Sequence, residues 1–131
     1  MKSLILALSS TFVFGSGIAY AEKPAAPPEA EAALLEGLKL VRDNKWDDWF
    51  KLCSPTKLCH NDNSKRSLKT YNLPALQRRA GECVINEKIT VTRVDELGKD
   101  DLKLFVDCGP NQMPKPFRLG KENGKWLFRS I

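Results

Sequence analysis

The 131-residue sequence contains a single histidine, and this scarcity narrows the chemistry that the chain can perform. His60 directly follows Cys59 in a polar stretch, where a solvated side chain is the simpler interpretation. A general base would also need an orienting partner and a pocket. Cys53, Cys59 and His60 lack the spacing of a zinc site, which would in addition need a reducing compartment. We therefore expect neither a metal nor a cofactor.

Other catalytic signatures are also missing. The sequence has no paired-carboxylate motif, no glycine-rich phosphate loop and no nucleophile elbow. Asp100-Asp101 falls in an expected turn, where such residues occur for backbone reasons. After residue 21 no segment approaches the roughly 20 apolar residues of a membrane span. These absences favour a binding domain over an enzyme, and they predict no transmembrane segment in the mature chain.

The first 21 residues have the pattern of a secretory signal peptide. Lys2 supplies the positive charge, an apolar run extends from Leu4 to Val13, and Ala19-Tyr20-Ala21 matches the small-x-small cleavage site. Cleavage would leave a mature chain that begins at Glu22 and is sized for one domain. We therefore expect a periplasmic or secreted protein.

Four cysteines lie in the mature part, and an even count in an exported chain predicts two disulfides. Four cysteines allow three pairings. We expect Cys53 to pair with Cys59 across a short local loop, and Cys83 to pair with Cys108. The second pair conflicts with a simple hairpin, which places Cys108 opposite Ile89. The Cys83–Cys108 pair needs a bulge or a bent strand. Otherwise Cys83 pairs with a cysteine in the helical first half of the mature chain.

Helical patterns fill the first half of the mature chain. Residues 22–30 are rich in proline and alanine and are expected to form a linker. From Glu31 an apolar repeat predicts a helix, and Asn44 is expected to cap a second helix that ends before Pro55. Residues 59–65 read as a polar loop. Residues 68–80 are expected to be helical, with a possible break at Asn72.

Period-two patterns fill the second half. They predict strands over residues 84–94 and 102–108, a third strand from Phe117 and a last strand over 126–131. Asn123-Gly124 is a strong hairpin signal. Helices followed by strands predict an α+β domain over residues 31–131, in which N-terminal helices pack on a curved antiparallel sheet of about four strands.

A resemblance accompanies this order of elements. The tail from Pro116 to Phe128 contains a Phe-x-Leu strand, an Asn-Gly turn and a Trp strand. Together with the preceding helices, it resembles the small exported members of the nuclear-transport-factor-2-like superfamily, whose fold is also called a cystatin-like cone. The resemblance implies this fold and a possible pocket. The carboxylate, Tyr or His residues that the enzymes of this superfamily use cannot be matched to positions in this chain.

Three groups of residues are candidates for binding. Arg118 and Arg129 are expected to face each other in the closing hairpin, with Asp107 as their neutralising partner or with an external anion between them. Trp46 and Trp49 are expected in the core, or against a ligand such as a sugar. A basic helical segment contains Arg78 and Arg79, which form either a solvated face or an anion-binding surface.

The formal net charge of +5 fits ordinary solubility, and no nucleic acid is expected. The sequence therefore predicts an exported, non-enzymatic binding or accessory domain, with a protein or an anionic ligand as its partner. An inhibitor or immunity-type protein acting on an exported enzyme is the alternative. A small enzyme of the cone-fold kind is the third possibility.

Overall fold

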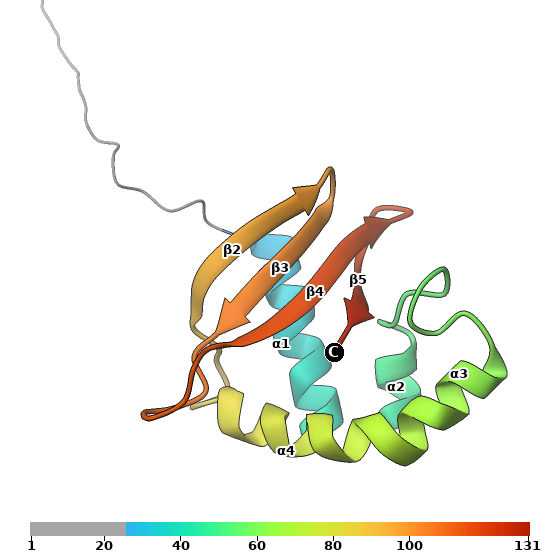
Figure 1. The fold of residues 1–131 in the computed structure, drawn as a ribbon, viewed down its shortest axis with the longest axis horizontal. Helices are drawn as coiled ribbons and strands as arrows, with labels where there is room; N and C mark the ends of the chain where they lie inside the picture. Colours follow the sequence, from blue (N-terminus) through green and yellow to red (C-terminus); the bar gives the residue numbers. More distant parts are fainter. Residues whose placement is uncertain (1–25) are drawn as a thin grey trace, which may run out of the picture.

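A computed structural model describes residues 26–131, so the expected signal peptide and the first residues of the expected linker lie outside the described part. The helices come first and a curved antiparallel sheet follows (Figure 1), which confirms the predicted α+β class. In chain order the helical elements are α1 (Pro28–Arg42), α2 (Trp46–Phe50), α3 (Asp62–Ser67), the π-helical segment η3 (Leu68–Asn72) and α4 (Leu73–Cys83). The strands are β2 (Val91–Gly98), β3 (Asp101–Val106), β4 (Lys115–Glu122) and β5 (Lys125–Ser130), in the spatial order β2-β3-β4-β5.

Helix α1 begins inside the expected linker, so the prediction of a linker to residue 30 is wrong at its end. Pro28 occupies the first turn, where a missing N–H costs nothing and a fixed φ favours the helix. Glu29 and Glu31 place negative charge near the helix N-terminus, and Lys39 and Arg42 place positive charge near its C-terminus. The proline-rich composition therefore marks a helix start as well as a linker.

Asn44 ends α1 rather than capping α2, contrary to the prediction. It has a φ of 63°, and its N–H donates to the carbonyl of Val41 at 3.1 Å. The N–H of Lys45 donates to the carbonyl of Leu40 at 2.8 Å. These two bonds form a Schellman motif, in which asparagine is tolerated at the left-handed position. Lys45 is left as the N-cap residue of α2.

Helices α3 and α4 form one continuous rod through η3. Asn61 caps the rod by accepting the N–H of Ser64 at 2.8 Å, so the expected polar loop over 59–65 ends before its last residues. The expected break at Asn72 is absent. Instead, the N–H of Leu73 donates to the carbonyl of Leu68, five residues earlier, which is a π-helical bond.

The expected strand over 84–94 is wrong in its first half. Helix α4 continues to Cys83, and Ile85 and Lys88 then pair across a tight turn in which Asn86 and Glu87 have positive φ. Glu87 anchors this turn to α1, because its carboxylate accepts from Arg42 Nη1 at 2.6 Å. The turn folds the chain back before β2 begins at Val91.

This turn also removes the geometric conflict in the second disulfide. Cys83 is paired with Cys108 and Cys53 with Cys59, as predicted. Cys83 reaches the end of β3 from the last residue of α4 rather than from within a strand. The second disulfide therefore ties the helical layer to the sheet.

In the closing hairpin, Asn123-Gly124 forms the turn and Leu119 lies opposite Phe128, as predicted. The expected pairing of Arg118 with Arg129 is wrong, because Arg118 lies opposite Ser130. A β-bulge makes Arg129 the extra residue of β5, and a bulge re-aims the side chain that it inserts.

The core lies between α1 and one face of the sheet, with α4 packed against α1 (Figure 1). Leu34 and Leu38 of α1 and Phe117 and Phe128 of the sheet are buried. Gly37 lets α1 approach β5 closely, because a Cβ at this position would collide with the ring of Phe128.

Candidate functional site

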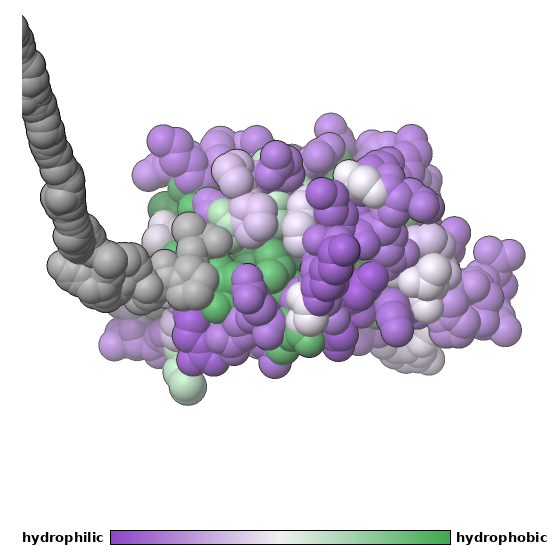
Figure 2. All heavy atoms as spheres, turned by 90° about the horizontal axis from the view of Figure 1, so that it is seen from above, coloured by the Kyte–Doolittle hydropathy of each residue, from purple (hydrophilic) through white to green (hydrophobic). Residues whose placement is uncertain are grey.

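A groove lined by both apolar and charged residues opens at the end of the molecule where α1 begins and the two hairpins turn. It has a volume of about 520 Å³ and is lined by Val94, Leu97, Leu102 and Trp126, with Pro27 at the start of α1. Figure 2 looks onto this end and shows a hydrophobic surface framed by hydrophilic side chains. Leu97 is 46% exposed.

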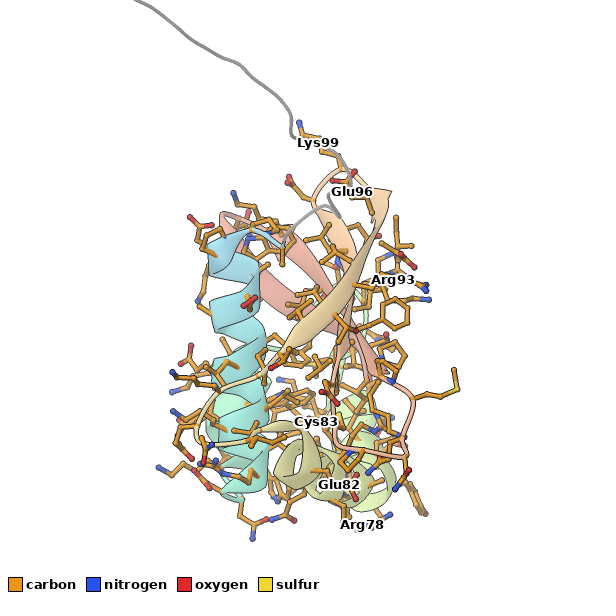
Figure 3. The ribbon with its side chains drawn as sticks, turned by 90° about the vertical axis from the view of Figure 1, so that its left-hand side faces the viewer. Arg78, Glu82, Cys83, Arg93, Glu96 and Lys99 are labelled. Carbon is orange, nitrogen blue, oxygen red and sulfur yellow. A yellow bond between two sulfur atoms is a disulfide. The ribbon has the colours of Figure 1, made fainter. Side chains whose placement is uncertain are left out.

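Charged side chains also line this groove. Glu96 lies near the end of β2, Lys99 and Asp100 form the β2–β3 turn, and all three are exposed. In Figure 3, Glu96 and Lys99 lie at the same end of the molecule, near the tip of that hairpin. The groove therefore combines apolar side chains with exposed charges of both signs, an arrangement that suits an apolar group carrying a polar end.

A second candidate site is a cluster of charges on the sheet, defined by Arg118, Arg129, Asp101 and Glu122. Arg118 donates to Asp101 through Nε at 3.0 Å and Nη2 at 2.6 Å. Arg129 lies 3.6 Å from Asp101 through Nη1 and donates to Glu122 through Nε at 3.1 Å. The two positive charges are thus matched by two negative charges within the chain.

The same cluster holds the loop closed by the first disulfide. The hydroxyl of Ser54, which is fully buried, donates to Glu122 Oε2 at 2.5 Å, and Thr56 donates to Oε1 at 3.1 Å. The backbone of Ser54 also bonds to Phe128 of β5. Glu122 therefore connects the Cys53–Cys59 loop to Arg129 on the sheet.

Both carboxylates of the cluster are stabilised in their charged form. Hydrogen bonding to Arg118 holds the pKa of Asp101 below its usual value, against the opposing effect of burial. Burial raises the pKa of Glu122, but hydrogen bonds from Ser54, Arg129 and Thr56 outweigh it and leave this pKa below the usual value. At neutral pH the cluster is a set of paired charges.

This geometry corrects the predicted arginine pair. Asp107 is not its partner, because β3 pairs with β4 in a register that places Asp101, not Asp107, beside Arg118 and Arg129. The Asp107 carboxylate instead accepts the N–H of Gly109 at 3.0 Å. Because Asp101 and Glu122 already neutralise the two arginines, the geometry favours an internal cluster over a site for an external anion.

The other predicted binding residues are dispersed. Trp49 is fully buried and stacks edge-on against Phe50 and Phe128, so it belongs to the core, whereas Trp46 is half-buried. Arg78 is exposed and Arg79 half-buried on α4. Figure 3 places Arg78 at the end of the molecule opposite Lys99. The predicted residues therefore do not converge on one site.

Sequence reasoning missed the groove and both carboxylates of the cluster. Leu97 was the sequence feature that could have indicated the groove, because an isolated leucine at the tip of a polar hairpin has no core to enter. Asp101 was assigned to a turn, although it is the first residue of β3. Its role depends on strand register, which local patterns do not fix.

The two disulfides are typical of proteins that fold in an oxidising, extracellular-type environment. Within residues 26–131, no helix has the length and apolar character needed to cross a membrane. Comparison of the chain with models of protein families, with curated proteins and with solved structures finds no match.

Proposed function

We propose that this chain is an exported, non-enzymatic binding domain whose groove holds an apolar group. The observation that carries this proposal is the groove itself, in which Trp126 and Leu102 form a floor beside the exposed Leu97. Filling it would bury Leu97 and remove apolar surface from water, at about 25 cal/mol per Å². The charges at the rim would orient the polar end of the bound molecule.

The shape of the molecule argues for binding rather than catalysis. The space between α1 and the sheet is filled by side chains that are fully buried, among them Leu34, Phe117 and Phe128. Glu96 and Asp100, the carboxylates of the groove, stand exposed at its rim. A catalytic carboxylate is usually desolvated, so that its pKa approaches the working pH.

The proposal includes export through the predicted signal peptide and a place in the nuclear-transport-factor-2-like superfamily. Two disulfides support the first part, and a helix packed across a curved antiparallel sheet supports the second. Mass spectrometry of the protein from an exporting host is expected to find Glu22 as the first residue. A mature chain that still begins at Met1 would contradict the export.

The groove can be tested with decanoate, a probe with an apolar tail and one charge. We expect decanoate to change the fluorescence of Trp126, and Trp126→Phe to remove that change. Leu97→Asp should weaken binding about tenfold or more, because it places a charge on the apolar wall. Met113→Asp is the matched control, since Met113 is 82% exposed and lies outside the groove. Equal weakening by both substitutions, or no fluorescence change in the wild type, would refute the proposal.

The inhibitor-type alternative has one observation in its favour. The Cys53–Cys59 loop exposes Pro55, Thr56 and Lys57, and its disulfide and Glu122 hold it in one conformation. Such preorganisation lowers the entropic cost of binding a protein. The test is inhibition of a trypsin-type protease, whose pocket takes a cationic side chain. Inhibition should be lost in Lys57→Ala but kept in Lys51→Ala, and an uninhibited protease would dismiss this alternative.

A further inference from the structure

The arginines of the molecule divide into two groups. Within residues 26–131, every arginine outside the rod of α3, η3 and α4 forms an ion pair with a carboxylate of the chain: Arg42, Arg93, Arg118 and Arg129. Arg66, Arg78 and Arg79 on the rod form no such pair within the described residues. Arg66 donates instead to the side-chain amide oxygen of Asn63 at 2.8 Å. The rod therefore presents positive charge that this part of the chain does not neutralise.

The remaining charges of the rod add to this excess. Lys65 and Lys69 bring its cations to five, and its two carboxylates belong to Asp62 and Glu82 at its two ends. Figure 1 shows the rod along the lower edge of the molecule, below the sheet. In Figure 3, Arg78 lies at the end opposite Lys99 and the groove. The basic surface is thus separate from the proposed groove site.

The π-helical segment turns part of this rod outward. Leu68 and Leu73 are both buried although they are five residues apart, a spacing that would separate them by about 140° around a regular α-helix. The wider turn of η3, closed by the bond from the N–H of Leu73 to the carbonyl of Leu68, keeps both on the packed side. The four residues between them are all exposed, including Lys69 and Tyr71, and Tyr71 is 76% exposed. Single π-helical turns are frequent at functional sites.

A small hollow lies beside the same segment. It has a volume of about 270 Å³ and is lined by Asn44, Lys45, Trp46, Asp47, Asp48 and Lys69. Trp46 is half-buried, so part of its ring is accessible. Lys51 lies 3.6 Å from Asp48 and offsets its charge. Asn44 and Asp47 can hydrogen-bond to hydroxyl groups. An aromatic ring, a cation from the rod and hydrogen-bonding groups thus meet in one place.

We propose that the rod and this hollow together bind a chain of acidic sugars. Arg66 and Arg78 are exposed and stand about 18 Å apart along the rod, at about 1.5 Å per residue, with Lys69 between them. This spread suits a polymer whose successive units meet one cation after another. A guanidinium binds a carboxylate through two hydrogen bonds, and the rings of Tyr71 and Trp46 offer apolar surfaces on which sugar rings stack. The inference does not depend on the proposed groove function.

A lipid surface fits the rod less well. An amphipathic helix binds a membrane by inserting its apolar face, and basic residues on the other face assist it. The apolar face of this rod is already used, because Leu68, Leu73 and Leu76 are buried and α4 packs against α1. A hydrated polyanion needs only the exposed charges and rings. The observations therefore favour an acidic polysaccharide over a bilayer.

The test measures binding of polygalacturonate to the mature chain at low salt, by calorimetry and by tryptophan fluorescence. Fully methyl-esterified polygalacturonate keeps the sugars but loses the charges, and it should bind about tenfold or more weakly. Trp46→Phe should remove the fluorescence change and Trp126→Phe should keep it. Decanoate should show the opposite pattern. Failure of this inference is therefore distinguishable from failure of the proposed groove function.

Matched variants locate the surface. Arg66→Ala with Lys69→Ala should weaken binding about tenfold or more and reduce its salt dependence. Lys121→Ala with Lys125→Ala removes the same charge from exposed positions of the β4–β5 hairpin and should leave the affinity within about twofold. Tyr71→Ala leaves the charge unchanged and should weaken binding about threefold. Circular dichroism shows whether each variant is folded.

Four results would overturn the proposal. The first is a wild-type protein that does not bind polygalacturonate at concentrations up to about 1 mM. The second is equal binding of the esterified polymer. The third is equal weakening by the two double variants. The fourth is binding of polyglutamate, or of phosphatidylglycerol vesicles, as tight as that of polygalacturonate, since neither contains a chain of sugars.

Discussion

The side chain of Arg129 lies directly over the Cα of Gly120 on the neighbouring strand. The bulge in β5 aims it there, since Arg129 is the residue that β4 leaves unpaired. From this position the guanidinium reaches both Asp101 and Glu122. The absence of a side chain at residue 120 is therefore what makes room for the charge cluster.

We expect Gly120→Ala to destabilise the protein by about 1–3 kcal/mol, because a new methyl group must displace Arg129. Gly81→Ala is the matched control. No atom lies within 4 Å of a Cβ at residue 81, and alanine favours the helix by about 1 kcal/mol. Denaturant unfolding of the two variants should therefore give shifts of opposite sign. A neutral Gly120→Ala would show that Arg129 moves aside freely.

The two arginines of the cluster should differ in their contribution to stability. Arg129 has a side chain that is 17% exposed, whereas that of Arg118 is 39% exposed. Removing Arg129 leaves Glu122 without its cationic partner and leaves Asp101 with Arg118 alone, which costs about 1–3 kcal/mol. Removing Arg118 breaks a partly solvated pair worth about 0–1 kcal/mol. Thermal unfolding of Arg129→Ala and Arg118→Ala should show this order, and the reverse order would contradict the assigned geometry.

The cluster should make stability depend on pH on the acid side. The pKa values of Asp101 and Glu122 lie below their usual values in the folded protein, so the unfolded chain binds protons more readily. Their stabilisation is complete above the unfolded pKa values of about 3.9 and about 4.3, and it is lost as the pH falls through the folded values. Asp101→Asn with Glu122→Gln should flatten this loss. The test is the denaturant midpoint of the wild type and of the double variant, measured between about pH 7 and about pH 3. If the midpoints of the two proteins fall equally with pH, the prediction is wrong.

The two disulfides should contribute unequally. Cys83–Cys108 spans 25 residues and Cys53–Cys59 spans 6. The chain-entropy relation assigns about 3.5 kcal/mol to the longer loop and about 2 kcal/mol to the shorter one. Replacing each pair by alanines should reproduce this order in denaturant unfolding. Peptide mapping without reduction should recover both pairings, and free thiols in the exported protein would contradict them.

Local chemistry was sufficient to predict the closing hairpin. Asn123 and Gly124 both have positive φ, as a two-residue turn that matches the strand twist requires. The earlier turn at Asn86-Glu87 has the same backbone signs but lacks glycine. The alternating apolar residues around it therefore suggested a longer strand, and tertiary anchoring of Glu87 by Arg42 accounts for the difference.

The sequence was sufficient to predict that carboxylates neutralise Arg118 and Arg129, but not which carboxylates do so. The sequence predicted Arg118 directly opposite Arg129 with Asp107 as their partner, whereas the structure places Asp101 and Glu122 beside the two arginines and Ser130 opposite Arg118. The identity of the aspartate depends on the register of β3 against β4, and the long connection between these strands leaves that register open from sequence alone. The bulge at Arg129 and the π-helical bond at Leu73 likewise arise from packing between elements. Neither has a signature in the local pattern of residues.

The Cys83–Cys108 disulfide encloses the whole β2–β3 hairpin in a covalent ring. A stretching force applied to the two ends of the chain therefore bypasses that hairpin and passes through the sulfur atoms. At about 3.5 Å per residue, the ring withholds roughly 8 to 9 nm of contour length from extension until the bond is reduced. Under tension, β2 and β3 would be among the last parts of the sheet to lose their shape.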